Sequence, residues 1–174
     1  MIKLTYDFSD LKKVKRSLIN TAMRRALYTV GEHWHKKYLP MHFGDGASAR
    51  YKYEGRKVGY LRRKKQKQKG RREWTRRDLK PLEFTGDAKR EALNTKRIKS
   101  AFRGGEGYVR ISLPAKFNWK HPNSAVRMNE EIRTVREDEL QALAAILASE
   151  FDRQIVKSSG GAFQRKAGFT LRGG

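Results

Sequence analysis

A block of positive charge in the middle of the chain constrains the fold more than any other feature. Residues 50–80 of this 174-residue sequence contain fifteen lysines and arginines but only three acidic residues. Apolar residues do not recur in the block at helical or strand spacing, so it cannot be buried as an ordinary helix or strand. We therefore expect a long, extended basic arm at about residues 40–82, and the sequences on either side must supply the core.

The N-terminal region has the clearest periodic pattern. Apolar and polar residues alternate over residues 2–8, which predicts a short, half-buried strand. From Leu11 onward, apolar residues recur every three or four positions and predict a long amphipathic helix with basic residues on its other faces. This helix is expected to end near Tyr38, because Pro40 disfavours helical backbone at the residue before it.

Regular patterns return after the arm. A brief helical segment is expected at residues 87–93, and a glycine-rich turn between two strand-like runs predicts a β-hairpin over residues 96–113. Residues 131–135 are consistent with a further short strand. Thr134 and Glu137 fit a capping box, and the apolar stripe behind them predicts a second amphipathic helix.

Together these segments predict a fold of the α+β class. Residues 1–157 are expected to form a single domain, in which a small antiparallel sheet is flanked by the long N-terminal helix and the C-terminal helix. The remaining residues, 158–174, are basic and contain several glycines, so we expect a flexible tail.

The composition of the chain points to an anionic partner. There are 41 lysines and arginines against 18 acidic residues, a formal net charge of +23, and the isoelectric point is near 10.6. This charge favours nucleic acid, an anionic surface or an acidic protein. The absence of cysteine excludes disulfides, thiolate metal sites and a cysteine nucleophile. The sequence has no recognisable signal peptide and no apolar run of bilayer length, so we expect synthesis in a cytoplasm and no membrane contact.

Catalytic and metal-binding patterns are weak. His33 and His35 would point about 200° apart on a helix, so they cannot share a metal ion. We expect this histidine group, which includes His42, to lie at a surface or interface near the helix end, where histidine stabilises the helix dipole. Glu83 and Asp87 only faintly resemble a nuclease carboxylate pair, and no nucleophile or phosphate-binding motif is present. We predict a protein that is not an enzyme and needs no metal or cofactor.

The basic arm supplies the candidate binding residues. Its cations could neutralise phosphates or contact acidic groups of a neighbouring subunit, and its rings could stack on the bases of a single strand. The basic candidates are Arg50, Lys52, Arg56, Lys57, Arg62, Arg63, Lys64, Lys65, Lys67, Lys69, Arg71, Arg72, Arg76 and Arg77. The aromatic candidates are Tyr51, Tyr53, Tyr60 and Trp74. A solvated arm is the simplest alternative, and residues 128–155, with seven acidic and three basic residues, offer an acidic complement.

The order of several short motifs along the chain is distinctive. His-Trp-His at residues 33–35 is followed by a proline, by His42 and Phe43, by Arg-Tyr-x-Tyr at residues 50–53, and then by the turn residues Pro81, Leu82, Thr85 and Gly86. This order, completed by the hairpin and the final helix, resembles the tail-completion, neck or virion-morphogenesis proteins of long-tailed bacteriophages. In that family a Thr-Gly turn opens a short helix that leads into the sheet, and the C-terminal helix packs across the sheet.

The resemblance implies a structural protein of the virion rather than an enzyme. Such a protein is a ring subunit at the head–tail junction, in contact with further copies of itself and with portal or adaptor and tail proteins. The arm would then reach into a neighbouring subunit or line a channel through which packaged DNA passes. The alternative, from a different class, is a standalone, sequence-nonspecific nucleic-acid-binding protein that stays monomeric and binds with a steep dependence on salt.

Overall fold

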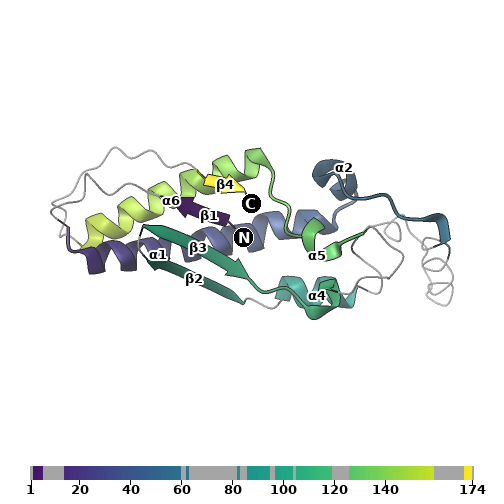
Figure 1. Cartoon of the computed structure of the whole chain (residues 1–174), viewed down its shortest axis with the longest axis horizontal. Helices are drawn as coiled ribbons and strands as arrows, with labels where there is room; N and C mark the ends of the chain where they lie inside the picture. The colour runs from purple at the N-terminus through teal and green to yellow at the C-terminus, as the bar shows by residue number, and fades with distance from the viewer. Residues whose placement is uncertain are drawn as a thin grey trace. The chain divides into compact units, whose positions relative to one another are not determined.

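A computed structural model describes residues 14–59, 62, 82, 86–94, 97–103, 105–118 and 126–158, together with the backbone of residues 2–5 and 171–173. These residues belong to two compact units (Figure 1). Unit 1 comprises Met1–His35, Arg97–Ser112 and Val135–Gly174, and unit 2 comprises Lys36–Lys96 and Leu113–Thr134. The domain expected at residues 1–157 spans parts of both units, and its single-domain character stays a prediction.

Unit 1 is built on an antiparallel sheet. Its strands are β1 (Ile2–Thr5), β2 (Ile98–Arg103), β3 (Glu106–Ile111) and β4 (Leu171–Gly173), and their order in the sheet is β2-β3-β1-β4. The predicted hairpin is confirmed as β2 and β3, which pair from Ile98 with Ile111 to Arg103 with Glu106. The short loop between them contains Gly105 at φ +88°, a conformation that glycine adopts without strain.

The expectation of a flexible tail at residues 158–174 is wrong for residues 171–173, which form β4. Leu171–Gly173 pairs with β1, because a strand with one unpaired side offers its backbone N–H and C=O groups to any extended segment within reach. Residues 159–170 of the expected tail lie outside the described residues. The predicted N-terminal strand is confirmed over residues 2–5.

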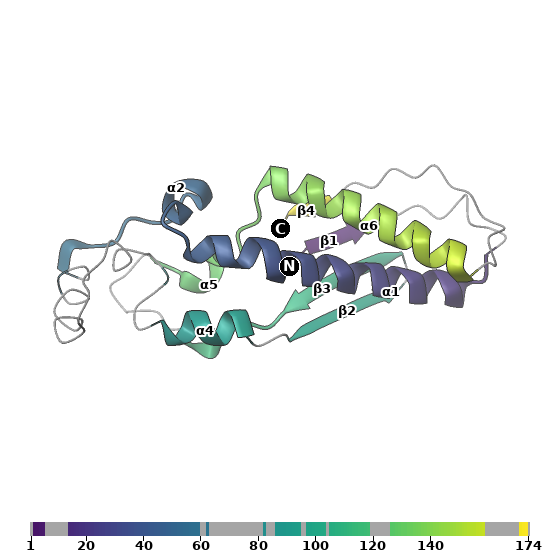
Figure 2. The same cartoon turned by 180° about the vertical axis from the view of Figure 1, so that it is seen from behind.

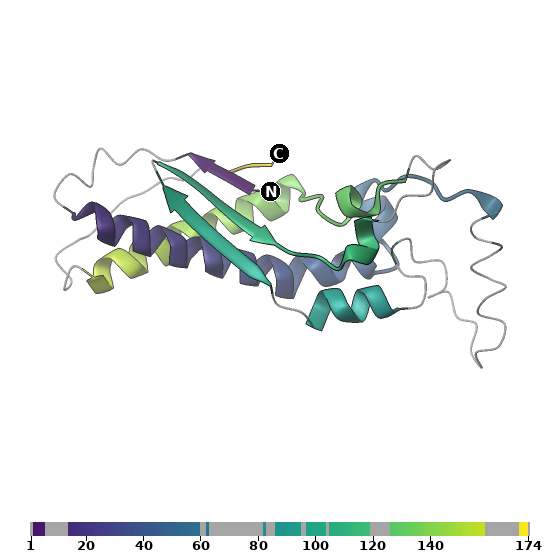
Figure 3. The ribbon, with the colours of Figure 1, turned by 60° about the horizontal axis from the view of Figure 1, so that its bottom comes forward.

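Two long helices complete unit 1 and confirm the predicted α+β class. They are α1 (Arg16–His33) and α6 (Glu137–Ser158), which lie side by side and cover the same face of the sheet (Figures 2 and 3). The stripe predicted for α6 is buried at Leu143, Leu147, Phe151 and Ile155. The stripe predicted for α1 is buried at Ala22, Ala26, Val30 and Trp34, whereas Val14 and Leu18 are only half-buried. The core side of α1 also includes Ile19, Met23 and Leu27, which the predicted stripe omits. Both helices therefore use one face, and none of the described helices of unit 1 covers the opposite face.

Two glycines allow α1 to lie unusually close to the hairpin. A Cβ atom added to Gly31 would lie 2.6 Å from Val109 Cγ2 and 2.8 Å from Ile98 Cγ2. On the other side of the contact, a Cβ atom on Gly107 would lie 2.8 Å from Leu27 Cδ1. Real Cβ atoms are not found at such distances, so each position requires a residue without a side chain.

The ends of the helices differ in detail from the sequence prediction. The α-helical part of α1 ends at His33 and continues as the π-helical turn η2 (Trp34–Tyr38) and the 3-10 helix η3 (Leu39–Phe43), so the helical conformation passes the expected end near Tyr38. The predicted capping box at the start of α6 is wrong by two residues. The backbone N–H of Arg136 donates to Glu139 Oε2 (3.3 Å), and the Arg136 carbonyl accepts the N–H of Leu140.

Unit 2 is assembled from short helices. Besides η3, it contains α2 (Ala47–Tyr51), α4 (Asp87–Asn94), the 3-10 helix η5 (Ala115–Asn118) and α5 (Met128–Glu131). The helix α4 confirms the brief helical segment expected there. The strand expected at residues 131–135 is wrong, because the segment forms helical turns instead. The N–H groups of Ile132, Arg133 and Thr134 donate to the carbonyls of Met128, Glu130 and Glu131. The buried side chains of unit 2 include Leu39, His42, Phe43, Tyr51, Phe117 and Ile132.

Candidate subunit and nucleic-acid interface

The first part of the basic arm is folded in unit 2. His42 is fully buried, and its ring stacks on Tyr51 with 3.8 Å between ring centroids and 10° between ring planes. Its Nδ1 atom shares a hydrogen bond with the hydroxyl of Tyr53, which is also buried. Tyr51 and Tyr53 are therefore core residues rather than the exposed stacking residues that the sequence predicts. Because His42 Nδ1 and the Tyr53 hydroxyl satisfy each other, these aromatic residues can be buried without a regular apolar stripe.

The charge state of His42 follows from this environment. Burial, reinforced by the positive charge of Arg50, lowers the pKa of His42 from 6.5 to about 4, and a hydrogen bond with the backbone of Glu131 opposes the change. The imidazole is therefore neutral at pH 7. The expectation of a surface or interface histidine is wrong for His42 and also for His35, which is buried.

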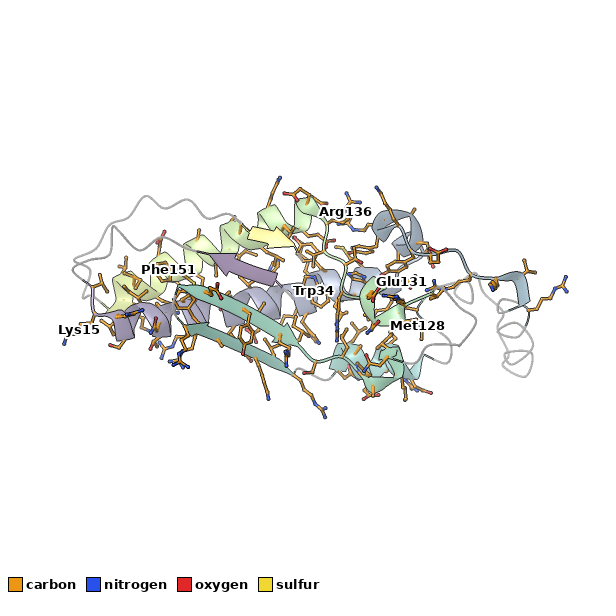
Figure 4. The ribbon with its side chains drawn as sticks, in the orientation of Figure 1. Lys15, Trp34, Met128, Glu131, Arg136 and Phe151 are labelled. Carbon is orange, nitrogen blue, oxygen red and sulfur yellow. The ribbon has the colours of Figure 1, made fainter. Side chains whose placement is uncertain are left out.

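Arg56 already has an acidic partner within its own unit. Its Nη1 atom lies 2.8 Å from Glu131 Oε1, and its Nη2 atom lies 2.5 Å from Glu131 Oε2. This is a bidentate ion pair, and each of the two side chains is only 10% exposed. The same carboxylate accepts the backbone N–H of Glu54 (3.1 Å), and Arg56 also donates to the Glu54 carbonyl (2.7 Å). Glu131 (Figure 4) thus fastens the arm near its start, so Arg56 is a structural residue rather than a free interface cation.

The remaining basic candidates fall into two groups. Within the described residues, Arg50 is half-buried with its guanidinium 5.6 Å from the centre of the Tyr51 ring, whereas Lys52, Lys57 and Arg62 are exposed. Nine basic candidates and two aromatic ones lie outside the described residues: Arg63, Lys64, Lys65, Lys67, Lys69, Arg71, Arg72, Arg76 and Arg77, with Tyr60 and Trp74. Their role as contacts for a subunit or for nucleic acid stays a prediction.

The expected turn before the sheet is described in part. Leu82 is buried, and Gly86 has φ +84° and accepts the N–H of Arg90 on its carbonyl (2.9 Å), so it directly precedes α4. Pro81 and Thr85 lie outside the described residues. The short helix then leads into β2, which starts at Ile98.

Metal binding and membrane insertion find no support in the described part of the chain. No three histidine or acidic side chains there lie close enough together to hold a metal ion. None of the described helices combines the length and the apolar character needed to cross a membrane.

The strand β2 forms an edge of the sheet, and no described strand pairs with its outer side. The N–H of Ser112 donates to the Arg97 carbonyl (3.0 Å), which fixes the alternation of the antiparallel ladder. Lys99 and Ala101 consequently direct their backbone groups toward β3, and Ser100 directs its N–H and C=O outward. The Ser100 hydroxyl is fixed separately, by a 2.9 Å hydrogen bond to the carbonyl of Arg24 in α1.

The outer face of this hairpin was not among the predicted candidates. It carries Lys99, Tyr108 and Arg110, all exposed. The signal was present in the sequence, because Tyr108 and Arg110 alternate with the buried Val109. In a half-buried strand such alternation places them on the solvent face.

No protein-family model matches the chain, and comparisons with curated proteins and with solved structures also give no match. The function must therefore be inferred from the residues and their geometry.

Proposed function

We propose that this chain is a structural protein of the head–tail connection of a long-tailed bacteriophage, a neck, tail-completion or tail-terminator protein. It assembles as a ring of identical subunits between the portal or adaptor and the tail. The order of the motifs along the chain supports this proposal, and so does the open edge of β2. The edge carries the proposal, because it gives the subunit a specific means of joining a neighbour.

An open strand edge is suited to the assembly of a ring. The outward N–H and C=O groups of Ser100 can pair with an extended segment of a neighbouring copy and so continue the sheet across the subunit boundary. Such a contact uses different surfaces on the two copies, and repetition of it by rotation closes a ring. The charged side chains of Lys99 and Arg103 on the same strand disfavour indiscriminate pairing with other edges.

The test is to block the edge without disturbing the hairpin. Ser100→Pro removes one outward N–H and leaves the ladder with β3 intact, and proline is tolerated in edge strands at such positions. Ser100→Ala is the matched control, because it loses the hydroxyl contact with Arg24 but keeps the N–H. Mass is measured by light scattering across a salt series, for the chain alone and with portal or tail partners, and circular dichroism checks folding.

The expected result is a closed oligomer for the natural chain and for Ser100→Ala, and a monomer for Ser100→Pro. The proposal fails if the natural chain stays monomeric both alone and with portal or tail partners. If a folded Ser100→Pro variant assembles as well as the natural chain, the edge of β2 does not join the subunits.

A standalone, sequence-nonspecific nucleic-acid-binding protein is the second candidate, favoured by the net charge of +23. It predicts a monomer that changes mass only when nucleic acid is added and that releases the nucleic acid as salt rises.

A further inference from the structure

The outer face of the β2–β3 hairpin combines exposed basic residues with an exposed tyrosine. Both long helices lie on the opposite face of the sheet, as Figures 2 and 3 show. Ile98, Phe102 and Val109 are turned toward that side, so the intervening residues face solvent. These outer-face residues are Lys99, Ala101 and Arg103 in β2 and Glu106, Tyr108 and Arg110 in β3.

Like charges meet across the two strands. The register places Lys99 directly opposite Arg110, an arrangement that destabilises a sheet unless an anion lies between the charges. Lys99, Arg103 and Arg110 form no ion pair with any described residue, although Glu106 lies opposite Arg103. The face therefore concentrates positive charge that the described residues of unit 1 do not neutralise.

An aromatic ring lies among these cations. Tyr108 is 42% exposed, a large value for a tyrosine in a paired strand. Its partner in β2 is Ala101, whose methyl group is too small to cover the ring. In the register of the sheet, Tyr108 pairs with Lys3 of β1, which in turn pairs with Arg172 of β4.

The combination of cations and an exposed ring selects the ligand. An acidic peptide would satisfy the charges but offers nothing that must stack on Tyr108, and a duplex keeps its bases stacked in its interior. A single strand supplies both phosphates and free base faces. We propose that the outer face of the hairpin binds single-stranded nucleic acid without sequence preference, with a base stacked on Tyr108 and phosphates on Lys99 and Arg110.

This site is distinct from the basic arm and from the edge proposed for assembly. The side chains of Lys99 and Tyr108 lie on a face of the sheet, whereas subunit pairing through Ser100 uses backbone groups at its edge. The two proposals can consequently fail separately, because Ser100→Pro tests the oligomer and the substitutions below test the nucleic-acid site.

Binding is measured with the full chain by fluorescence anisotropy, using a labelled oligothymidine strand and a duplex of the same length over a salt series. The face is tested by the double substitution Lys99→Gln with Arg110→Gln. Its control is Arg16→Gln with Lys157→Gln, which removes the same charge from exposed positions on the helices. The ring is tested by Tyr108→Thr, which keeps a β-branched residue in the strand, against Tyr108→Phe, which keeps the ring.

The face variant should lower the slope of log affinity against log salt for the single strand by about 1.4, since each phosphate contact contributes about 0.7. The control pair should change it by clearly less. Tyr108→Thr should weaken binding of the single strand roughly 5- to 150-fold, the range known for a stacked base, and leave the duplex unaffected, while Tyr108→Phe should bind normally. Photo-crosslinking to a bromouracil-containing strand should label the peptide that contains Tyr108.

Several results would overturn the proposal. Equal effects of the control and face variants would show that binding depends on net charge alone. Equal effects of Tyr108→Thr on both nucleic acids, or none on either, would exclude stacking. Crosslinks confined to residues 60–80 would assign the single strand to the basic arm rather than to the hairpin. If polyglutamate competes with the strand, and Tyr108→Thr does not change the binding of polyglutamate, the face would be assigned to an acidic partner.

Discussion

Acidification should destabilise unit 2 through His42. In the folded chain the pKa of His42 is lowered to about 4, whereas in the unfolded chain it returns to 6.5. Between these values the unfolded state binds more protons than the folded state, so the free energy of unfolding falls as the pH is lowered. The destabilisation begins near pH 6.5, grows with falling pH and is complete below about pH 4.

The size of this effect follows from the two pKa values. A difference of 6.5 − 4 = 2.5 units corresponds to about 3 kcal/mol at about 1.4 kcal/mol per unit. At pH 5 the loss is about 2 kcal/mol, a sizeable part of the ~5–15 kcal/mol that stabilises a typical domain. The groups that face the imidazole include Arg50, the rings of Tyr51 and Tyr53, and the backbone of Glu131. Arg50 adds to the penalty by repelling the protonated ring.

The assay compares the natural chain with His42→Gln, whose amide can still bond to the Tyr53 hydroxyl but does not titrate. Urea unfolding between pH 7.5 and 4 gives the free energies, and amide hydrogen exchange of peptides from residues 37–59 reports on unit 2. The natural chain should lose about 2 kcal/mol more than the variant on going from pH 7 to pH 5. Two results would refute the reasoning: parallel pH profiles, or an NMR titration of His42 near pH 6.5.

Two further substitutions test the packing, one in each unit. Gly31→Ala should lower the free energy of unfolding by about 1–3 kcal/mol. The new methyl group would overlap Val109, whose branched side chain has few alternative rotamers. Gly55→Ala, in open space, is its control, and urea unfolding that ranks the two equally would contradict the close approach. Glu131→Gln should cost about 1–3 kcal/mol by leaving Arg56 without its carboxylate, and hydrogen exchange should rise in unit 2; unchanged exchange would mean that the ion pair does not fasten the arm.

Local patterns were sufficient to predict the main elements of unit 1. The apolar stripes of α1 and α6 and the glycine turn of the hairpin depend on residues within a few positions of one another, which a sequence displays directly. Which face of the sheet the helices cover could not be predicted in this way. That choice depends on the close contact of Gly31 with Val109, two residues far apart in the chain, and no periodic pattern in the sequence indicates the contact.

The start of the arm could not be predicted for a similar reason. Residues 40–59 have no helical or strand period, yet they supply much of the core of unit 2, because His42 and Tyr53 pair their polar atoms and Glu131 neutralises Arg56. The partners in the second pair are 131 − 56 = 75 residues apart. The sequence indicated a basic segment and a separate acidic segment, but only the fold shows that Arg56 pairs with Glu131.

The strand β1 is made long before the strands that pair with it. Its residue Ile2 pairs with Val109, 109 − 2 = 107 residues later, and with Gly173, 173 − 2 = 171 residues later. At roughly 5–20 residues per second, a ribosome needs roughly 10–30 s to supply the second partner. The β3 side of β1 can pair once Val109 has been made, but the other side of β1 stays without its partner until Leu171–Gly173 has been made and can pair with other chains until then. The sheet can be completed only when translation has reached its last strand.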